Sequence, residues 1–329
     1  MGALVDTFGR VHNDLRVSLT DRCNLRCTYC MPPEGLEWLP SDVALTDDEV
    51  VRVVGLAVRM LGITDVRLTG GEPLLRRGLI DLVRRLGELE PRPRLSMTTN
   101  GIGLARVASA LASAGLDRIN VSLDTMHRAT FVALSRRDRL DDVIAGLDAA
   151  YAAGLRPVKV NTVLVRGVND SEALDLLDHC VARGYELRFI EQMPLDAQHG
   201  WDRTVMVSAA ETLALLRTRH RLTPLAGRGS APAEQYLVDD GPSVVGVIAS
   251  VTEPFCAACD RVRLTADGQV RNCLFAREET DLRTPLRDGA DDETLAGLFR
   301  EAIAGKRAGH GIDDPAFVQP QRPMSAIGG

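Results

Sequence analysis

The sequence lacks any run of about eighteen uncharged apolar residues, which is the length that a membrane-spanning helix needs. Its start, Met1 to Asp6, has neither a signal-peptide pattern nor the serine or threonine that a myristoylation site would place at position 6. We therefore expect a cytoplasmic protein without a membrane partner. An excess of basic charge is also missing, because the net charge is −6. This argues against nonspecific nucleic-acid binding, so a polyanionic ligand would need a local basic pocket.

Cysteine is scarce and unevenly placed. The seven cysteines stand at positions 23, 27, 30, 180, 256, 259 and 273. An odd number that is clustered at metal-ligand spacing does not suit a disulfide framework, and in a reducing compartment it predicts two metal sites and one spare thiol. The spare one, Cys180, lies in a helical pattern and is expected to be a core residue.

The first cluster, Cys23, Cys27 and Cys30, supplies three thiolates and no fourth. A structural zinc site needs four protein ligands, whereas a cubane iron–sulfur cluster held by three thiolates leaves one iron open to a non-protein ligand. The alternatives are a zinc loop or three buried thiols. The β-rich run Leu15 to Thr20 leads directly into this loop, which favours a site at the carboxyl end of a strand.

The first two-thirds of the chain alternates between strand and helix patterns. The predicted strands are 15–20, 66–69, 95–99, 119–123, 158–165 and 187–190, and the predicted helices are 46–61, 104–114, 141–153 and 171–183. A capping box, Thr46 with Glu49, begins the first helix, and Gly154 and Gly184 are expected to end two others. This pattern predicts an α/β fold, a partial TIM-like (β/α)6 barrel that is open on one side.

After Trp201 the pattern changes, so we expect a barrel domain over residues 1–200 and a second region over 201–329. The second region is predicted to be an α+β extension that carries a second iron–sulfur site and is placed to cap the barrel's opening. It contains a helix at 209–219, strands at 235–238 and 244–249, and a hairpin of 261–265 with 269–273. The segment 226–232 is expected to be a surface loop.

The second predicted strand ends in Gly70-Gly71-Glu72-Pro73. Two glycines allow the backbone to approach a ligand closely, and Glu72 offers a carboxylate to an ammonium group. Alone this signal is weak, and a simple tight turn is the alternative. The motif stands about forty residues after the first cysteine loop, and the two motifs together are more informative than either one alone.

The second cysteine cluster, Cys256, Cys259 and Cys273, again provides three thiolates. A zinc site would need a fourth ligand, but no histidine lies between these cysteines and the nearest one downstream is His310. A second open iron–sulfur cluster is favoured. Arg261 and Arg263 follow at alternate positions of a strand, and therefore on one face. They form either a solvated surface or, beside an open metal, a clamp for phosphate or carboxylate oxygens.

Together these motifs resemble the radical S-adenosylmethionine (SAM) superfamily, and specifically the GTP 3′,8-cyclases, which begin molybdenum cofactor biosynthesis. The likeness covers essentially the whole chain. It depends on residues 21–30, 67–73, 98–101, 120–124, 159–161, 188–194, the Cys256 group and the ending Gly328-Gly329.

The resemblance implies a role for each matching position. The cluster ligands would be Cys23, Cys27, Cys30, Cys256, Cys259 and Cys273. SAM would be contacted by Tyr29, Gly70, Gly71, Glu72, Ser122 and Met193. GTP would be held by Arg16, Arg67, Thr98, Lys159, Arg188, Arg261, Val262 and Arg263, and the guanine would bind the open iron of the second cluster. The residues implied in catalysis are Arg16, Arg261, Arg263, Gly328 and Gly329, the last two forming a tail that enters the active site. Relatives commonly have a basic residue where this chain has Asp65.

The implied reaction is radical cyclisation of GTP to (8S)-3′,8-cyclo-7,8-dihydroguanosine 5′-triphosphate, with two [4Fe-4S] clusters and SAM as cofactors. The implied partners are GTP, an external electron donor and the next enzyme of the pathway, cyclic pyranopterin monophosphate synthase, and a homodimer is compatible with the resemblance. Two alternatives stay open. One is a radical enzyme with an auxiliary cluster that acts on a peptide or another small molecule, and the other is a noncatalytic zinc-bound scaffold.

Overall fold

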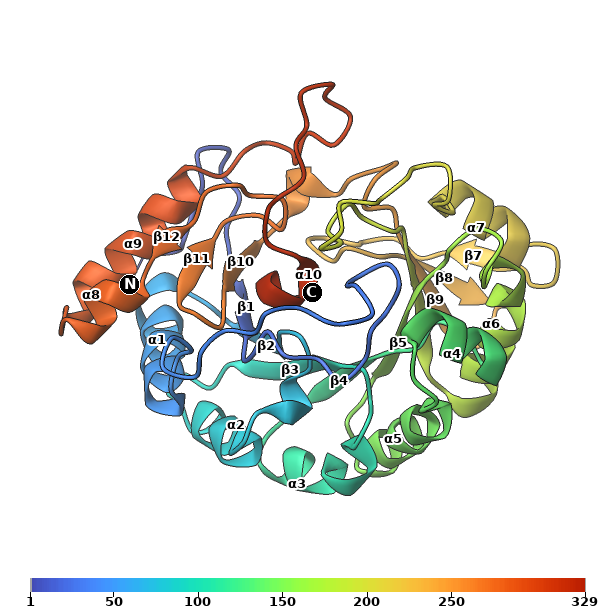
Figure 1. The fold of residues 1–329 in the computed structure, drawn as a ribbon, viewed down its shortest axis with the longest axis horizontal. Helices are drawn as coiled ribbons and strands as arrows, with labels where there is room; N and C mark the ends of the chain where they lie inside the picture. Colours follow the sequence, from blue (N-terminus) through green and yellow to red (C-terminus); the bar gives the residue numbers. More distant parts are fainter. Residues whose placement is uncertain (1, 329) are drawn as a thin grey trace.

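A single continuous sheet forms the centre of the computed structural model, which describes residues 2–328. Within these residues, twelve strands lie in the order β12-β11-β10-β1-β2-β3-β4-β5-β6-β9-β8-β7. The sheet curves, and the helices other than the short C-terminal one lie on its outer side, as Figure 1 shows. The run from β1 to β6 is parallel throughout, so the predicted βα units are confirmed and form a partial barrel.

The elements have the following bounds. The strands are β1 (Asp14–Ser18), β2 (Asp65–Thr69), β3 (Arg94–Thr99), β4 (Arg118–Ser122), β5 (Val158–Val163), β6 (Glu186–Ile190), β7 (Leu222–Pro224), β8 (Glu234–Val238), β9 (Val244–Ile248), β10 (Arg261–Leu264), β11 (Gln269–Arg271) and β12 (Thr280–Asp281). The helices are α1 (Asp47–Leu61), α2 (Leu79–Gly87), α3 (Ala108–Ser113), α4 (Arg128–Ser135), α5 (Leu140–Ala152), α6 (Ala173–Arg183), α7 (Ala209–Leu216), α8 (Arg283–Arg287), α9 (Asp292–Ala304) and α10 (Met324–Ile327).

Local signals fix several helix ends. Thr46 and Glu49 form the predicted capping box at the start of α1, which satisfies backbone N–H groups that have no partner inside the helix. At the end of α6, Gly184 takes the left-handed conformation that favours glycine and turns the chain into β6. Gly154 has the same conformation just after α5.

The C-terminal region does not form a separate sheet over the barrel's opening. Its strand β10 pairs in parallel with β1, and its strand β9 pairs in parallel with β6, so residues beyond 201 extend the barrel sheet at both edges. The predicted hairpin is present as β10 and β11, which pair antiparallel. The predicted boundary at residue 200 stays a prediction, since the sheet is continuous across it.

Side chains alternate strictly between the two faces of the barrel strands. Leu15 and Val17 of β1, like Val66 and Leu68 of β2, point outward and belong to the buried apolar core against the helices. The residues between them, above all Arg16 and Arg67, point into the barrel. An apolar outer face holds the helices, and a polar inner face is left for a ligand.

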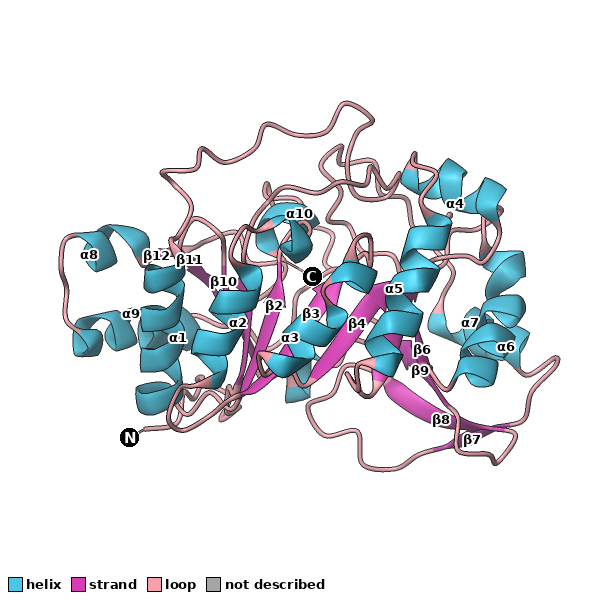
Figure 2. Ribbon diagram, turned by 90° about the horizontal axis from the view of Figure 1, so that it is seen from below, coloured by secondary structure: helices cyan, strands magenta, loops and turns pink. Residues whose placement is uncertain are grey.

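The end of the chain lies inside the fold. The short helix α10 is near the middle of the barrel in Figure 1 and at one end of the strands in Figure 2. It packs with Leu195 and Phe275 in a small second apolar cluster through Ile327. No helix in the part of the chain that the structure describes is long and apolar enough to cross a membrane.

Candidate active site

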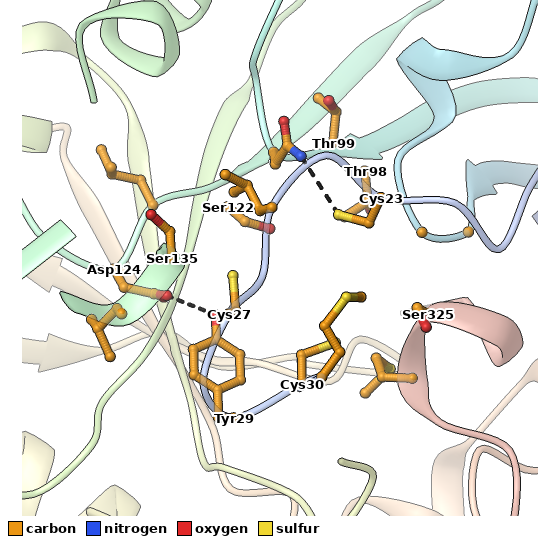
Figure 3. Close-up of a pocket in the computed structure, with 18 of the residues that line it drawn as sticks. Cys23, Cys27, Tyr29, Cys30, Thr98, Thr99, Ser122, Asp124, Ser135 and Ser325 are labelled. Atoms are coloured by element: carbon orange, nitrogen blue, oxygen red, sulfur yellow. Dashed lines mark hydrogen bonds between the residues drawn. The ribbon is translucent and has the colours of Figure 1, made fainter. Parts of the chain in front are cut away.

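A cavity of about 180 Å³ opens where the strands β2, β3 and β4 end (Figure 3). Thr69, Thr99 and Ser122, the last residues of these strands, lie in its wall. The carboxyl ends of parallel strands meet at one edge of the barrel, which is where such folds keep their chemistry. The wall also contains these residues predicted for the site: Cys23, Cys27, Tyr29, Cys30, Gly70, Gly71 and Thr98.

The three thiols of the first cluster are brought together in this cavity. Burial, the Cys23 thiol and the Asp196 carboxylate raise the pKa of Cys30 to about 12, and burial also raises the pKa of Cys23 and Cys27. The Asn100 amide nitrogen lies 3.9 Å from the Cys23 sulfur, and the backbone N–H of Ser325 donates to the Cys30 sulfur. Three converging thiols with N–H donors around them suit a metal cluster, which binds cysteines in their thiolate form.

Gly70 and Gly71 have a packing reason to be glycine. A Cβ at Gly71 would lie 2.3 Å from the carbonyl oxygen of Arg22, and one at Gly70 would lie 2.3 Å from that of Thr20. The backbone N–H of Gly71 donates to Thr20 over 2.7 Å. The glycines therefore allow the turn after β2 to lie directly on the loop that carries the first cysteines.

Glu72 supports this turn from beneath. It is completely buried and accepts hydrogen bonds from the Thr99 hydroxyl at 2.6 Å and from the backbone N–H groups of Asn100 at 2.6 Å and Leu74 at 2.9 Å. Both carboxylate oxygens are engaged. The structure thus gives Glu72 a supporting role beneath the turn, and its contact with an ammonium group stays a prediction.

Tyr29 is held in place by a buried carboxylate. Its hydroxyl donates to Asp124 at 2.6 Å, and the other Asp124 oxygen accepts from the backbone N–H of Val163 at 2.9 Å. Burial raises the pKa of Asp124 to about 6. This pair fixes the aromatic ring in the wall of the cavity, as Figure 3 shows.

Met193 lines a smaller adjoining cavity of about 70 Å³. Tyr29, Cys30 and Met324 belong to the walls of both cavities. The predicted SAM contacts Tyr29, Gly70, Gly71, Ser122 and Met193 are therefore gathered around the first cysteine cluster.

The second cysteine cluster is also assembled. Cys256 is close enough to Cys259 and Cys273 for their charges to affect its pKa, which burial raises. Cys259 differs: despite burial, Arg261 and Lys306 lower its pKa. The ammonium of Lys306 lies 3.5 Å from its sulfur. The thiolate form is therefore less costly at Cys259 than at Cys256.

The predicted basic residues converge inside the barrel. Arg16 has Arg263 as its register partner on β10 and Arg67 as its partner on β2, while Lys159 and Arg188 lie on β5 and β6. All point to the inner face, because they alternate with core residues. The six cationic side chains of this basic cluster are Arg16, Arg67, Lys159, Arg188, Arg261 and Arg263.

The basic cluster has more positive charge than its acidic neighbours balance. Within the described residues, Asp14, Glu186 and Asp260 lie within 4.0 Å of its members, which leaves an excess of three positive charges. The Nε atoms of Arg16, Arg67 and Arg188 are buried without a hydrogen-bond partner. A buried N–H group without a hydrogen-bond partner destabilises the folded protein, unless a ligand accepts a hydrogen bond from it.

Burial and mutual repulsion also disfavour the charged forms in this cluster. They lower the pKa of Arg16 to about 9, that of Arg67 to about 10 and that of Lys159 to about 8. Burial, Arg16 and Arg261 lower the pKa of Arg263 as well. A polyanion bound here would favour the charged forms and so raise these pKa values.

Two predictions need correction or comment. Val262 is completely buried in the apolar core, on the face of β10 opposite to Arg261 and Arg263, so its side chain cannot contact a ligand in the barrel. Asp65, at the start of β2, pairs with Arg94 at 2.6 Å and Arg118 at 3.6 Å, and so contributes no positive charge.

The C-terminal tail reaches the basic cluster at Gly328, while the catalytic role implied for it stays a prediction. Its carbonyl oxygen accepts a hydrogen bond from Arg263, and the carbonyl oxygen of Ile327 accepts one from Ser18 at 2.8 Å. A Cβ at Gly328 would collide with Ser18 and Thr69. Gly329, the other predicted tail residue, lies outside the described residues.

Both thiol clusters fit the cofactors that the sequence implies. Within residues 2–328, no three His, Cys, Asp or Glu side chains lie close enough to hold a single metal ion. A cubane spreads its ligands over separate irons, and each cluster offers three thiols, which leaves one iron without a protein ligand.

Several residues of the site escaped prediction. Asn100 and Asp124 lie within motifs that were recognised, but their contacts depend on the folded loop. Met324 and Ser325 line the first cavity although they are 294 and 295 residues from Cys30 in the chain. Lys306 follows a helix that was not predicted, and no local pattern marks it.

Two family models match the chain. The radical SAM superfamily matches residues 17–180, and Molybdenum Cofactor Synthesis C matches residues 185–312. Among curated proteins, a GTP 3′,8-cyclase of Streptomyces coelicolor is 66% identical over 99% of this chain and 96% of its own length. A GTP 3′,8-cyclase of a Mycobacterium species is 62% identical over 100% of this chain and 94% of its own length.

Solved structures share the fold at lower identity. A radical SAM methyltransferase from Sphaerobacter thermophilus is 22% identical, with a TM-score of 0.50 over 80% of this chain and 70% of the other. This likeness agrees with the partial barrel.

Proposed function

The chain belongs to the GTP 3′,8-cyclase family of radical SAM enzymes, and we propose that its basic barrel interior holds GTP between two three-thiol cluster sites. It catalyses the cyclisation of GTP to (8S)-3′,8-cyclo-7,8-dihydroguanosine 5′-triphosphate, the first step of molybdenum cofactor biosynthesis. The observation that supports the proposed site most strongly is the excess positive charge at the basic cluster, which a triphosphate would neutralise.

The cofactors are assigned by the donor sets. Cys23, Cys27 and Cys30 would hold the [4Fe-4S] cluster that works with SAM. We propose that Cys256, Cys259 and Cys273 hold a second one, whose open iron would take the guanine. When bound, the first cluster and SAM supply the radical that removes hydrogen from C3′ of the ribose, so that this carbon can bond to guanine C8.

The protein's own residues position the substrate. Arg16, Arg261 and Arg263 would grip phosphate oxygens from neighbouring strands, with bidentate geometry that guanidinium groups favour. Arg261 already has a fixed orientation, because it stacks 4.5 Å from the Phe255 ring and donates to the Ser230 carbonyl at 3.0 Å. Pre-orientation of this kind reduces the entropy lost when the ligand binds.

On the SAM side, Gly70, Gly71 and Ser122 would present backbone and hydroxyl groups, with Tyr29 and Met193 on the other walls. Met324 and Ser325 of the tail lie in the wall of the first cavity, and Gly328 contacts Arg263 of the basic cluster. Exclusion of water is needed here because a carbon radical must not meet other hydrogen donors.

Further parts of the account are proposals. We propose that an external donor supplies the electron, that the product passes to cyclic pyranopterin monophosphate synthase, and that the enzyme works in the cytoplasm. A homodimer and a functional boundary near residue 200 are proposed on the resemblance alone.

The proposed function is tested by anaerobic incubation of the reconstituted protein with SAM, dithionite and GTP deuterated at C3′. Mass spectrometry should find a cyclised nucleotide and 5′-deoxyadenosine that carries the deuterium. A cyclised product without deuterium transfer, or no product from protein that holds both clusters, would contradict the proposal.

A further inference from the structure

Two segments from opposite ends of the chain meet at the loop of the second cysteine cluster. Near the N-terminus, Val5 and Val11 form an antiparallel bridge, and Arg10 in the same hairpin donates to the carbonyl of Cys256 at 2.7 Å. Arg10 also donates to the carbonyls of Arg307 at 2.6 Å and Ala308 at 3.1 Å. The N-terminal hairpin therefore fastens the segment after α9 to this loop (Figure 1).

Lys306, at the start of that segment, points its ammonium group at the cluster site. Its Nζ donates to the Arg261 carbonyl at 2.8 Å and to the Cys259 sulfur at 3.5 Å. A third contact, at 3.3 Å, reaches Nδ1 of His12. The Cys259 carbonyl oxygen also lies 3.5 Å from this Nζ, and Lys306 is only 4% exposed, so its ammonium group is surrounded by protein atoms.

The His12 contact defines a relay of hydrogen bonds. An ammonium has no acceptor, so Nδ1 of His12 must accept and its Nε2 carries the proton. That Nε2 donates to Asp6 at 3.2 Å, and Asp6 also accepts from the backbone N–H groups of Phe8 and Arg10, both at 2.9 Å. Burial and Lys306 lower the pKa of His12 to about 4, so the ring is neutral at pH 7.

The composition makes this lysine more notable. Lysine occurs twice in the chain, at 159 and 306, whereas the other 37 of its 39 basic residues are arginine. Both lysines are buried beside the proposed substrate and cluster sites. An ammonium is compact and donates in three directions, which the planar guanidinium fork cannot do in the same space.

We propose that Lys306, oriented by His12 and Asp6, is a positioning residue that donates to the Cys259 thiolate and raises the reduction potential of the second cluster. This inference depends on the proposed function, in which that cysteine cluster holds an iron–sulfur cluster. A donor and a positive charge at a ligating sulfur stabilise the more negative, reduced form. Through the Arg261 carbonyl, the same ammonium also joins the cluster loop to the phosphate clamp.

The test is a redox titration followed by electron paramagnetic resonance. The full chain would carry Cys23, Cys27 and Cys30 changed to serine, so that the signal comes from the second cluster. In this background Lys306→Met should destabilise the reduced cluster by at least about tenfold, which corresponds to a potential lower by 59 mV for a one-electron couple. Arg300→Met, which removes an exposed cation of α9, should leave the potential unchanged.

The outcomes separate this inference from the proposed function. A fully loaded cluster with the same potential in Lys306→Met as in the background protein would overturn the role of Lys306. Should Lys306→Met not hold its cluster, His12→Gln decides: it leaves the charge but removes the orientation, and should lower the potential by a smaller amount. An unchanged potential there also overturns the inference. A background protein without any second cluster would instead contradict the proposed function.

Discussion

Arg16 and Arg263 occupy partner positions on the neighbouring parallel strands β1 and β10, one near the start of the chain and the other near its end. The Arg16 side chain is 11% exposed and Arg263 is 4% exposed, and burial together with other arginines lowers the pKa of both. Two buried guanidinium groups side by side repel each other unless an anion lies between them. This arrangement of charges therefore favours the binding of a polyanion between Arg16 and Arg263.

The clamp can be tested on Arg261 and Arg263. Their joint replacement by alanine should weaken GTP binding by at least about tenfold, because each charged hydrogen bond contributes about 1.5–3 kcal/mol. SAM cleavage should stay measurable, since neither residue lines the cavity of the first cysteines. Isothermal titration calorimetry measures the affinity, with Arg300→Ala as a surface control. An unchanged affinity for GTP would show that Arg261 and Arg263 do not clamp its phosphates.

The pH dependence of GTP binding should report on Lys159. Burial and Arg188 lower its pKa to about 8, while Glu186 at 2.9 Å opposes this shift. The bound triphosphate favours the charged form, so affinity is complete below that pKa and falls as the pH rises through it. Between about pH 7.5 and 9 the affinity should fall by up to about tenfold per pH unit.

Lys159→Arg provides the control for this pH dependence. Arginine keeps its proton to a higher pH than lysine does in the same surroundings, so the fall in affinity should move to higher pH. Binding by the unaltered chain that is independent of pH in this range would show that Lys159 does not contact the triphosphate.

The tight packing at Gly71 predicts a selective loss of the first cluster. Gly71→Ala would place a Cβ 2.3 Å from the Arg22 carbonyl, which must displace the loop of Cys23 and Cys27. Iron content should fall by about half, with the second cluster retained. Gly297→Ala in α9 meets no atom within 4 Å and should leave the iron content unchanged. Equal iron in both variants would refute the packing argument.

Arg322 anchors the C-terminal tail and should control its effect on turnover. Its guanidinium forms a fork with Asp267 at 2.7 and 2.9 Å and also reaches Glu279 at 2.8 Å. Arg322→Ala should release the tail, which would lower turnover severalfold and expose α10 to carboxypeptidase. Arg322→Lys retains one charge but loses the fork, so an intermediate effect is expected. Full activity with a protease-sensitive tail would show that tail placement is not needed.

Local signals in the sequence account for much of the barrel. The capping box of Thr46 and Glu49 and the turn at Gly184 depend on neighbours in the chain, and both are confirmed. The motif residues Cys23, Cys27, Cys30, Gly70 and Gly71 lie in the wall of one cavity, because both motifs follow a strand and the strands are parallel, while their roles stay predictions.

Long-range pairings could not be predicted. Nothing near Arg261 indicates that β10 lies beside β1, since strand order is decided by packing across the whole sheet. Helix α9 could have been found, because Asp291 caps it and Leu295 and Phe299 recur at helical spacing. The meeting of His12, Lys306 and Cys259 joins three distant segments, and no periodicity reveals it.

Our central proposal is that the chain holds two separate iron–sulfur clusters, each on three cysteines. Its most direct test is iron and sulfide analysis of anaerobically reconstituted protein together with two triple cysteine-to-serine variants, one for each thiol cluster. We expect about eight irons in the unaltered chain and about four in each variant. Eight irons retained in the variant without Cys256, Cys259 and Cys273, or zinc in place of iron at that site, would contradict it.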